Sequence, residues 1–323
     1  MMHKRTYAIT VILLFVIISC FVFFYFYCIH ELDIMHIKNW KDKYQHNFLE
    51  NNPSVNQFSI ETGKTGLGIF IRGTISDWKY LKILLSNLKA NYCLGIEAAD
   101  DLSALRLMNS NSSLIIGIKT DSYCSLGYKD LSFLRKTNIS NVNIWYNVTL
   151  NSLSGIEDCN VRRLAILDAA DIMDYHILEQ TNIECLVLKN AKHLSSLKGI
   201  NRMKRLKSLT ICGAKISALS DLAGNKTIED LSVSNSNITD LTPLSSMKRL
   251  TALTIMNLPI TNLEPLSTNY NLQYLYISGT LINDLSPLAK LHRLKKIHVD
   301  EKDMGRLNIP TSMKNVYVLR NID

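Results

Sequence analysis

Apolar residues recur along the carboxy-terminal half of the chain with a period of 22 residues. Five segments begin 22 residues apart, and each has apolar residues at its first, fourth and sixth positions. These positions hold Leu206/Leu209/Ile211, Ile228/Leu231/Val233, Leu250/Leu253/Ile255, Leu272/Leu275/Ile277 and Leu294/Ile297/Val299. Self-similarity at a fixed period of this length predicts a solenoid of stacked repeats.

The local pattern within a repeat predicts two kinds of element. Positions three to seven alternate between variable and apolar residues, which is the period of a short strand with one buried face. A second apolar row, such as Ile238, Leu241 and Leu244, has a spacing near three and favours a turn or a 3₁₀ segment on the outer side. A single repeat cannot bury its apolar face alone, so neighbouring repeats must stack.

Weaker copies of the pattern extend upstream. Three of them are Ile139/Val142/Ile144, Val161/Leu164/Ile166 and Ile183/Leu186/Leu188, and two looser ones lie around Leu94/Ile96 and Ile116/Ile118. We expect an insertion near Cys124–Tyr128, about ten strands between Asn91 and Val299, and a last strand at Val316–Leu319. Residues 91–323 are therefore assigned to leucine-rich repeats with a carboxy-terminal cap.

Residues 66–90 predict an amino-terminal cap. Leu67–Ile71 has the pattern of a strand, and Asp77–Leu88 that of an amphipathic helix with Ser76 or Asp77 as its N-cap. A terminal repeat is expected to differ from the others because one of its faces meets water.

The repeats resemble the 22-residue class of leucine-rich repeats found in bacterial internalins. The segments Ile238–Leu250 and Leu275–Leu291 carry the resemblance, together with the pairs Pro243-Leu244, Pro265-Leu266 and Pro287-Leu288. In each pair the leucine lies six residues after the start of a second apolar row. The resemblance implies an α/β horseshoe with short parallel strands on its concave face, and a role in binding rather than catalysis. One departure is at position nine, often Asn in that class, where this chain has Ala191, Ala214, Ser236, Leu258 and Thr280.

The amino terminus predicts a membrane anchor. Residues 7–29 form an uncharged, apolar run that would span about 34 Å as a helix, enough for a hydrocarbon core of about 30 Å. Lys4 and Arg5 precede the run, so the positive-inside rule leaves residues 1–6 in the cytoplasm and places the repeats in the periplasm or outside the cell. Residues 30–65 follow as a juxtamembrane helix and a linker, the latter over Asn51–Gly66.

Two alternatives to the anchor remain open from the sequence. A cleaved signal peptide has a shorter apolar core and an Ala-x-Ala-like exit, which this chain lacks. A lipoprotein signal fits Ile17–Cys20, with Cys20 as the lipidated residue, but Phe21–Tyr27 stays apolar where a lipoprotein turns polar.

The formal net charge is +8, and basic residues gather just before and at the start of the strands. We call the following set the basic rim: Lys204, Arg205, Lys207, Lys248, Arg249, Arg293, Lys295 and Lys296. Such a rim suits anionic lipid, a glycan or an acidic protein, or it simply keeps the array soluble. Asp240 and Asp284 are expected on the opposite side, and the predicted topology argues against nucleic acid as a partner.

No catalytic motif stands out in the chain, so we predict neither an enzyme nor a cofactor. His30, Asp33 and His36 have helical spacing but lie at the predicted membrane boundary, and no metal site is assigned to them. The cysteines have no CxxC motif and no paired spacing.

The variable strand positions are the candidate binding surface. Aromatic and long side chains gather there, and the candidate partner-binding residues are Trp145, Tyr146, Arg163, Met256, Tyr274, Tyr276 and His298. Tyr, Trp and Arg are enriched in interface hot spots. The leading hypothesis is a membrane-anchored protein that binds a protein partner through its concave face. The others are an envelope module that binds anionic lipid or polysaccharide through the basic rim, and a toxin-neutralising immunity protein.

Overall fold

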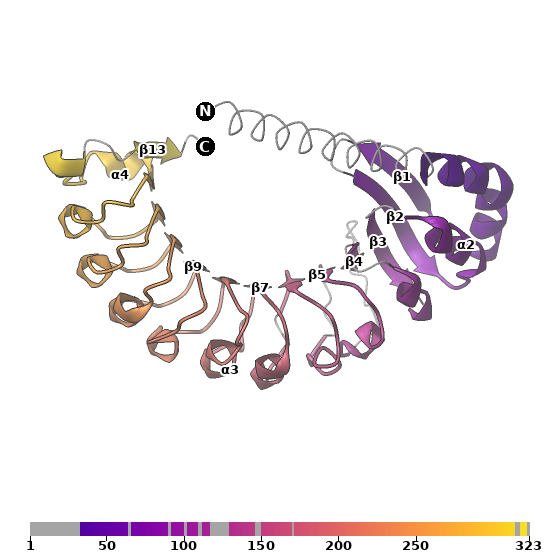
Figure 1. Ribbon diagram of the computed structural model, residues 1–323, viewed down its shortest axis with the longest axis horizontal. Coiled ribbons are helices and arrows are strands. Elements are labelled where there is room, and N and C mark those ends of the chain that lie inside the picture. Colours follow the sequence, from indigo (N-terminus) through magenta and orange to yellow (C-terminus); the bar gives the residue numbers. More distant parts are fainter. Residues whose placement is uncertain are drawn as a thin grey trace, which may run out of the picture.

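The computed structural model describes residues 33–63, 66–89, 92–99, 102–108, 112–116, 129–145, 150–169, 171–313 and 317–321. The molecule is a horseshoe whose strands line its inner surface, with short helical turns outside (Figure 1). The described residues form one sheet of 13 strands in chain order, β1 to β13. This geometry confirms the predicted leucine-rich repeat solenoid, including its short parallel strands on the concave face.

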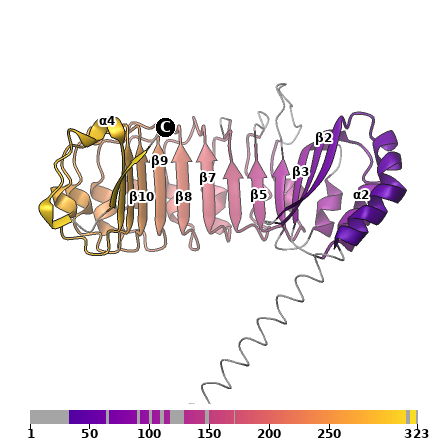
Figure 2. The ribbon, with the colours of Figure 1, turned by 90° about the horizontal axis from the view of Figure 1, so that it is seen from above.

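The repeat strands are four or five residues long and run parallel to one another (Figure 2). They are β4 (Ser113–Ile116), β5 (Asn141–Ile144), β6 (Arg163–Ile166), β7 (Cys185–Lys189), β8 (Ser208–Cys212), β9 (Asp230–Ser234), β10 (Ala252–Met256), β11 (Tyr274–Ser278), β12 (Lys296–Asp300) and β13 (Tyr317–Asn321). With β3 (Tyr92–Ala99), ten strands lie between Asn91 and Val299 in the described residues, as predicted, and β13 is the expected last one.

Short helices lie on the outer side of the horseshoe, where the second apolar row predicts them (Figure 1). They are η1 (Ser103–Leu107), η2 (Ser132–Leu134), η3 (His176–Gln180), α3 (Lys198–Asn201), η4 (Ser220–Leu222), η5 (Thr242–Ser246), η6 (Glu264–Leu266) and η7 (Ser286–Leu288), followed by α4 (Glu301–Met304) and η8 (Thr311–Met313). Proline occupies the first turn of η5, η6 and η7, where its missing N–H costs no hydrogen bond.

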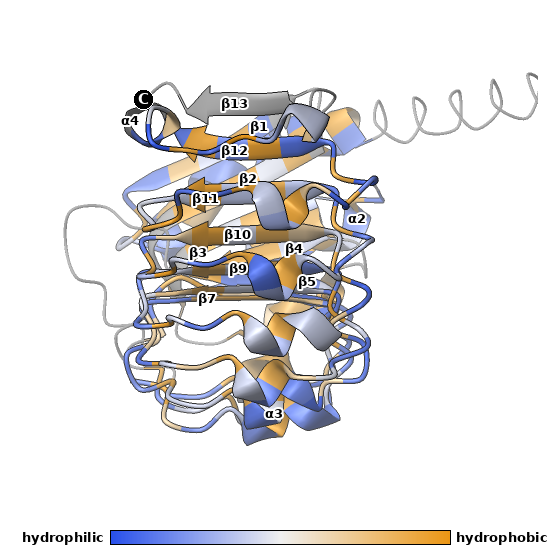
Figure 3. Ribbon diagram, turned by 90° about the vertical axis from the view of Figure 1, so that its left-hand side faces the viewer, coloured by the Kyte–Doolittle hydropathy of each residue, from blue (hydrophilic) through white to orange (hydrophobic). Residues whose placement is uncertain are grey.

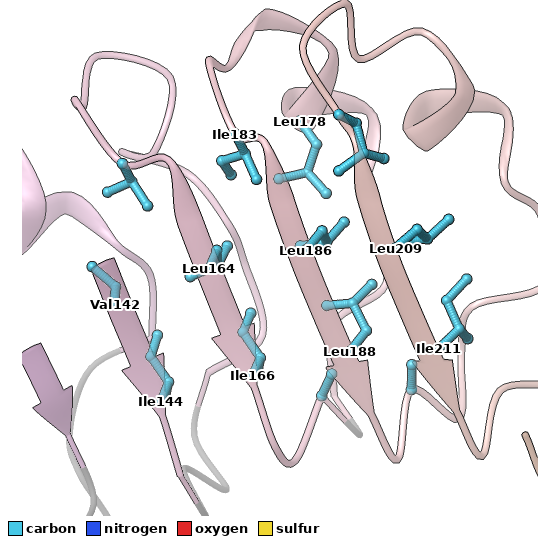
Figure 4. Close-up of a cluster of buried hydrophobic side chains, with 14 of the residues drawn as sticks. Val142, Ile144, Leu164, Ile166, Leu178, Ile183, Leu186, Leu188, Leu209 and Ile211 are labelled. Carbon is cyan, nitrogen blue, oxygen red and sulfur yellow. The ribbon is translucent and has the colours of Figure 1, made fainter. Parts of the chain in front are cut away.

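The core lies between the sheet and these outer helices. The apolar residues at positions four and six stack strand on strand, with Leu209 beside Leu231 and Ile211 beside Val233. Each of these four side chains is 2% exposed or less, and the same stacking is drawn for the neighbouring repeats in Figure 4. Apolar residues mark the strands while the loops at the lateral edges are largely hydrophilic (Figure 3). The 22-residue period thus builds one continuous core.

The turns after β7 to β11 depend on a row of residues that the sequence analysis overlooked. Position eight holds Asn190, Gly213, Asn235, Asn257 or Gly279, and all five have positive φ. Glycine and asparagine are the residues that tolerate this left-handed conformation best. Asn257 Nδ2 also donates to Asn235 Oδ1 at 2.9 Å, which links adjacent repeats. The position-nine residues are buried behind this row.

The amino-terminal cap is larger than predicted. It comprises a helix over residues 33–51, β1 (Gln57–Gly63), β2 (Gly66–Ile75), α2 (Lys79–Asn87) and β3. The linker predicted over Asn51–Gly66 is therefore wrong for β1, which pairs antiparallel with β2. The physical reason that this segment forms a strand is Phe58. Its ring centroid lies 5.4 Å from that of Trp40 and 5.5 Å from that of Phe48, so β1 packs against the core.

Buried polar side chains fasten the helix over residues 33–51 to the rest of the cap. The Asn52 side chain, fully buried, accepts hydrogen bonds from the N–H groups of Ser76 and Asp77 and donates to the Phe48 and Asp77 carbonyls. Asp33 Oδ1 accepts from the Lys89 N–H at 2.9 Å. These contacts hold the first described residues against the segment that leads into β3.

The register of one weak repeat differs from the prediction. β4 places Leu114 and Ile116 beside Leu94 and Ile96 of β3, rather than Ile116 and Ile118. A slip of two residues keeps the same side chains on the same face of a strand, so alternation alone could not detect it. The expected insertion at Cys124–Tyr128 lies outside the described residues.

The predicted anchor at residues 7–29 and the tail at residues 1–6 also lie outside the described residues. Within the part of the chain that the structure describes, no helix is both long enough and apolar enough to cross a membrane. The anchor therefore stays a prediction.

Candidate functional site: the concave surface

Strand geometry presents positions three, five and seven of each repeat on the concave surface. In β8 and β12 these positions are partly exposed while positions four and six are buried. The parallel pairing aligns the exposed residues in rows, so that Thr254, Tyr276 and His298 are neighbours along one row. Ala252, Tyr274 and Lys296 form the adjacent row.

The carboxy-terminal part of this surface exposes large side chains. Tyr274 and Met256 are each 37% exposed and Tyr276 is 36% exposed. Together with His298 they lie on the adjacent strands β10, β11 and β12, and we call these four residues the aromatic patch. The structure therefore brings four of the seven candidate partner-binding residues together.

Ring contacts order the aromatic patch. The rings of Tyr276 and His298 stack with their centroids 4.3 Å apart and their planes 8° apart. Lys295 Nζ lies 5.9 Å from the centroid of the Tyr274 ring, within the range of a cation–π contact. Beside them, the Ser278 hydroxyl donates to Asp300 Oδ2 at 2.7 Å. Side chains fixed in this way lose less conformational entropy when a partner binds.

The other candidate residues lie elsewhere on the surface. Trp145 follows β5 and is partly buried, and Tyr146 lies outside the described residues. Arg163 opens β6 and donates to Cys185 Sγ at 3.3 Å. Five strands lie between β5 and β11, and the six inter-strand spacings of about 4.8 Å amount to roughly 29 Å, so Trp145 does not join the aromatic patch.

Strands β8 and β9, which lie between these two ends, carry small or polar residues on the concave surface. Ser208 and Thr210 of β8 align with Asp230 and Ser232 of β9. This stretch leaves room above the sheet, and the aromatic patch borders it on one side.

Apart from Lys296, which lies on the concave surface, the basic rim lies along the edge where the strands begin, and it is partly neutralised. Lys207 Nζ is 2.9 Å from Glu184 Oε2, and Arg249 donates to Glu229 Oε1 at 2.6 Å. The hydrogen bond from Lys207, and then its charge, lower the pKa of Glu184. Both glutamates occupy position two of the preceding repeat, and the sequence analysis did not count them.

The remaining rim residues have neutral partners or no hydrogen bond. Lys248 donates to the Thr268 carbonyl and hydroxyl, and Arg293 donates to Asn271 Oδ1 at 2.6 Å. Lys204 and Arg205 are exposed and make no hydrogen bond or ion pair with any residue that the structure describes. They line a shallow hollow of about 320 Å³ together with Glu184, Lys207, Thr227, Glu229 and Arg249.

Among the described residues, no group of three or more His, Cys, Asp and Glu side chains could hold a metal ion. Asp33 is buried and bonded to the Lys89 N–H, and His30 lies outside the described residues. Cys93, Cys159, Cys185 and Cys212 are free thiols, and burial raises the pKa of Cys159 to about 11.

Three solved structures are similar to this chain at low sequence identity and with TM-scores below 0.5. Internalin C2 from Listeria monocytogenes is 18% identical over 68% of this chain and 83% of its own, with a TM-score of 0.44. InlF of the same organism is 19% identical over 78% of this chain and 79% of its own, with a TM-score of 0.41. A plant peptide hormone receptor, RGFR1 in complex with RGF2, is 12% identical over 82% of this chain and 40% of its own, with a TM-score of 0.38. No family model and no curated protein matches the sequence.

Proposed function

We propose that this leucine-rich repeat protein is a membrane-anchored recognition protein that binds a protein partner through its concave surface. Residues 7–29 are the proposed anchor, and the repeats stand on the non-cytoplasmic side. The single observation that carries the proposal is the aromatic patch, in which Met256, Tyr274 and Tyr276 are each more than one-third exposed on adjacent strands.

The aromatic patch has the composition of an interface anchor. Tyrosine supplies a large contact area at a low cost in conformational entropy, and interface hot spots are enriched in it. The buried residues of the same strands already supply the core, so the exposed rings are not needed for stacking of the repeats. The small residues of β8 and β9 beside them give a partner access to the surface.

Affinity capture tests the proposal. The full chain, solubilised in detergent, is used to capture proteins from solubilised membranes, and the captured proteins are identified by mass spectrometry. The Tyr274→Ala/Tyr276→Ala variant is compared with wild type, and Thr210→Ala/Ser232→Ala serves as a control in the row of Tyr276. A protein lost only with the tyrosine variant supports the proposal, and identical captures with all three chains contradict it.

A dedicated toxin, bound by the same surface, is one form that the protein partner could take. The captured protein decides between such an immunity role and a general receptor role. The basic rim is a weaker candidate for an independent ligand site because Glu184 and Glu229 neutralise Lys207 and Arg249.

A further inference from the structure

We infer that the edge of the horseshoe where the strands begin rests on the surface of the membrane that holds residues 7–29. The binding partner of this edge would be the phosphate-bearing headgroups of anionic lipids. The inference rests on the proposed anchor but not on the proposed concave partner.

The first observation is the position of Asp33, four residues after the end of the proposed anchor. Asp33 contacts the Lys89 N–H, three residues before β3 starts at Tyr92. Because the strands from β2 onward are parallel, all of them begin at this same edge, the lower one in Figure 2. Four Cα–Cα steps separate residue 29 from Asp33 and reach at most about 14 Å. An anchor that ends at residue 29 therefore keeps this edge close to the lipid surface.

The second observation is a difference in charge between the two lateral edges. We define the strand-start edge by the four residues that precede each of β6 to β11, and the strand-end edge by the four residues that follow the seventh repeat position of the same strands. The strand-start edge holds seven bases and two acids, and the strand-end edge holds two bases and two acids. The charged residues of the strand-start edge are Arg162, Lys204, Arg205, Lys207, Lys226, Lys248, Arg249, Glu184 and Glu229, and those of the strand-end edge are Lys192, Lys215, Asp168 and Asp171.

This difference in charge favours one orientation. Basic residues within a Debye length of an anionic leaflet are attracted to it. The strand-start edge has a net charge of +5 and is therefore attracted to such a leaflet. The strand-end edge has a net charge of zero and is attracted only weakly.

The third observation concerns exposed side chains on the same edge. Tyr270 is 58% exposed in the loop before β11, and Ile34 and Met35 are 36% and 48% exposed beside Asp33. Aromatic rings sit well at the level of lipid headgroups, and apolar side chains gain by reaching the acyl boundary. The hollow of about 320 Å³ that Lys204 and Arg205 line lies on this edge too, and its two unpaired cations suit a phosphate group.

In this orientation the horseshoe lies flat on the bilayer, with its strands roughly along the membrane normal. The concave surface then opens sideways, parallel to the membrane. A partner would reach the aromatic patch by moving along the membrane surface, so the orientation limits which proteins can bind without adding any contact to them.

The test uses the full chain in lipid nanodiscs with a fluorescent amino acid at Lys226 or at Lys215. Both are exposed lysines, 11 residues apart, on opposite edges of the horseshoe. Energy transfer to an acceptor on the lipid headgroups is measured in neutral nanodiscs and in nanodiscs with about one-third anionic lipid. We expect at least twofold more transfer from position 226 than from position 215 in anionic nanodiscs, and a smaller difference at high salt.

Charge reversal provides the matched control. Lys204→Glu/Arg205→Glu should remove the difference between the two probes, whereas Lys189→Glu/Lys192→Glu, at the other edge, should preserve it. Equal transfer from both positions in wild type, or more from position 215, overturns the inference while leaving the concave partner untouched. A chain that alkaline carbonate extracts from membranes overturns the anchor, and with it this inference.

Discussion

Strands β8–β9 and β11–β12 have the same backbone and the same buried rows but different concave surfaces. Leu209 and Leu275 are equally buried at position four. At position five, β8 and β9 carry Thr210 and Ser232, whereas β11 and β12 carry Tyr276 and His298. The repeat therefore determines which side chains enter the core but does not constrain the residue types at the concave positions. The bulky side chains of β11 and β12 thus need a reason other than folding.

Replacing a buried leucine should have the largest effect, a loss of stability that is similar in the two regions. Leu275→Ala in β11 and Leu209→Ala in β8 should each lower the free energy of unfolding by about 2–5 kcal/mol, because each leaves a cavity in a core that cannot collapse around it. Tyr276→Ala should change it far less. Urea denaturation of the chain in detergent, followed by circular dichroism, measures all three. A loss for Tyr276→Ala equal to that for Leu275→Ala would make the aromatic patch part of the core.

Removal of the tyrosine rings should have the next largest effect, on binding rather than on stability. Tyr274→Ala/Tyr276→Ala should raise the dissociation constant of the captured partner about 30-fold, which is about 2 kcal/mol, as expected for a hot spot. Thr210→Ala/Ser232→Ala should stay within about twofold of wild type. Titration calorimetry with the purified partner measures the dissociation constants. Equal losses for both pairs would show that the aromatic patch has no special part in binding.

The left-handed turn after β10, which lies between the two regions, should have a smaller effect, on stability. Asn257→Ala should cost about 1–2 kcal/mol, since alanine tolerates the observed φ of 52° poorly and cannot donate to Asn235. Asn257→Gly keeps the conformation and should cost less. Thermal unfolding of the two variants provides the comparison, and an alanine variant as stable as the glycine variant would remove the role assigned to the backbone conformation.

The outer turns should make the smallest contribution to the stability of the folded state, and this contribution depends on pH. Hydrogen bonds from the Thr242 and Ser286 hydroxyls, followed by their N–H groups, lower the pKa of Asp240 and Asp284 below the ordinary value of 3.8. A carboxyl whose pKa is lowered in the folded state stabilises it above the unfolded pKa, and this stability is lost as pH falls through the folded value. Asp240→Asn/Asp284→Asn should therefore flatten the decline of Tm below about pH 4 and leave the slope between pH 5 and 7 unchanged. A decline as steep as that of wild type would show that other carboxyls control it.

Sequence reasoning succeeded where the buried rows are complete and failed where they are not. The register of the strands from residue 139 to 299 follows from the leucine rows, and the exposed positions follow from strand alternation. β4 was misplaced by two residues because a slip of two keeps the same side chains on the same face. β1 was missed because its contacts with Trp40 and Phe48 of the preceding helix lie outside the repeat pattern.

The candidate site was predicted only as a set of positions. The stacking of Tyr276 on His298 depends on side-chain rotamers, which periodicity does not specify. The neutralisation of the basic rim by Glu184 and Glu229 depends on contacts 20 to 23 residues apart in the chain. A search for acidic residues at position two of the repeats would have found Glu184 and Glu229. A search for Asn and Gly at position eight would have found the row of left-handed turns.

Site-specific photo-crosslinking tests the central claim most directly. A photoreactive phenylalanine derivative replaces Tyr276 in the aromatic patch, or Ser232 or Lys290 as controls on the small-residue strands and on the outer side. Irradiation of intact membranes should give one protein adduct at position 276, a weaker one or none at 232, and none at 290. An adduct at 290 of equal strength, or none at 276, would contradict a concave binding surface centred on the aromatic patch.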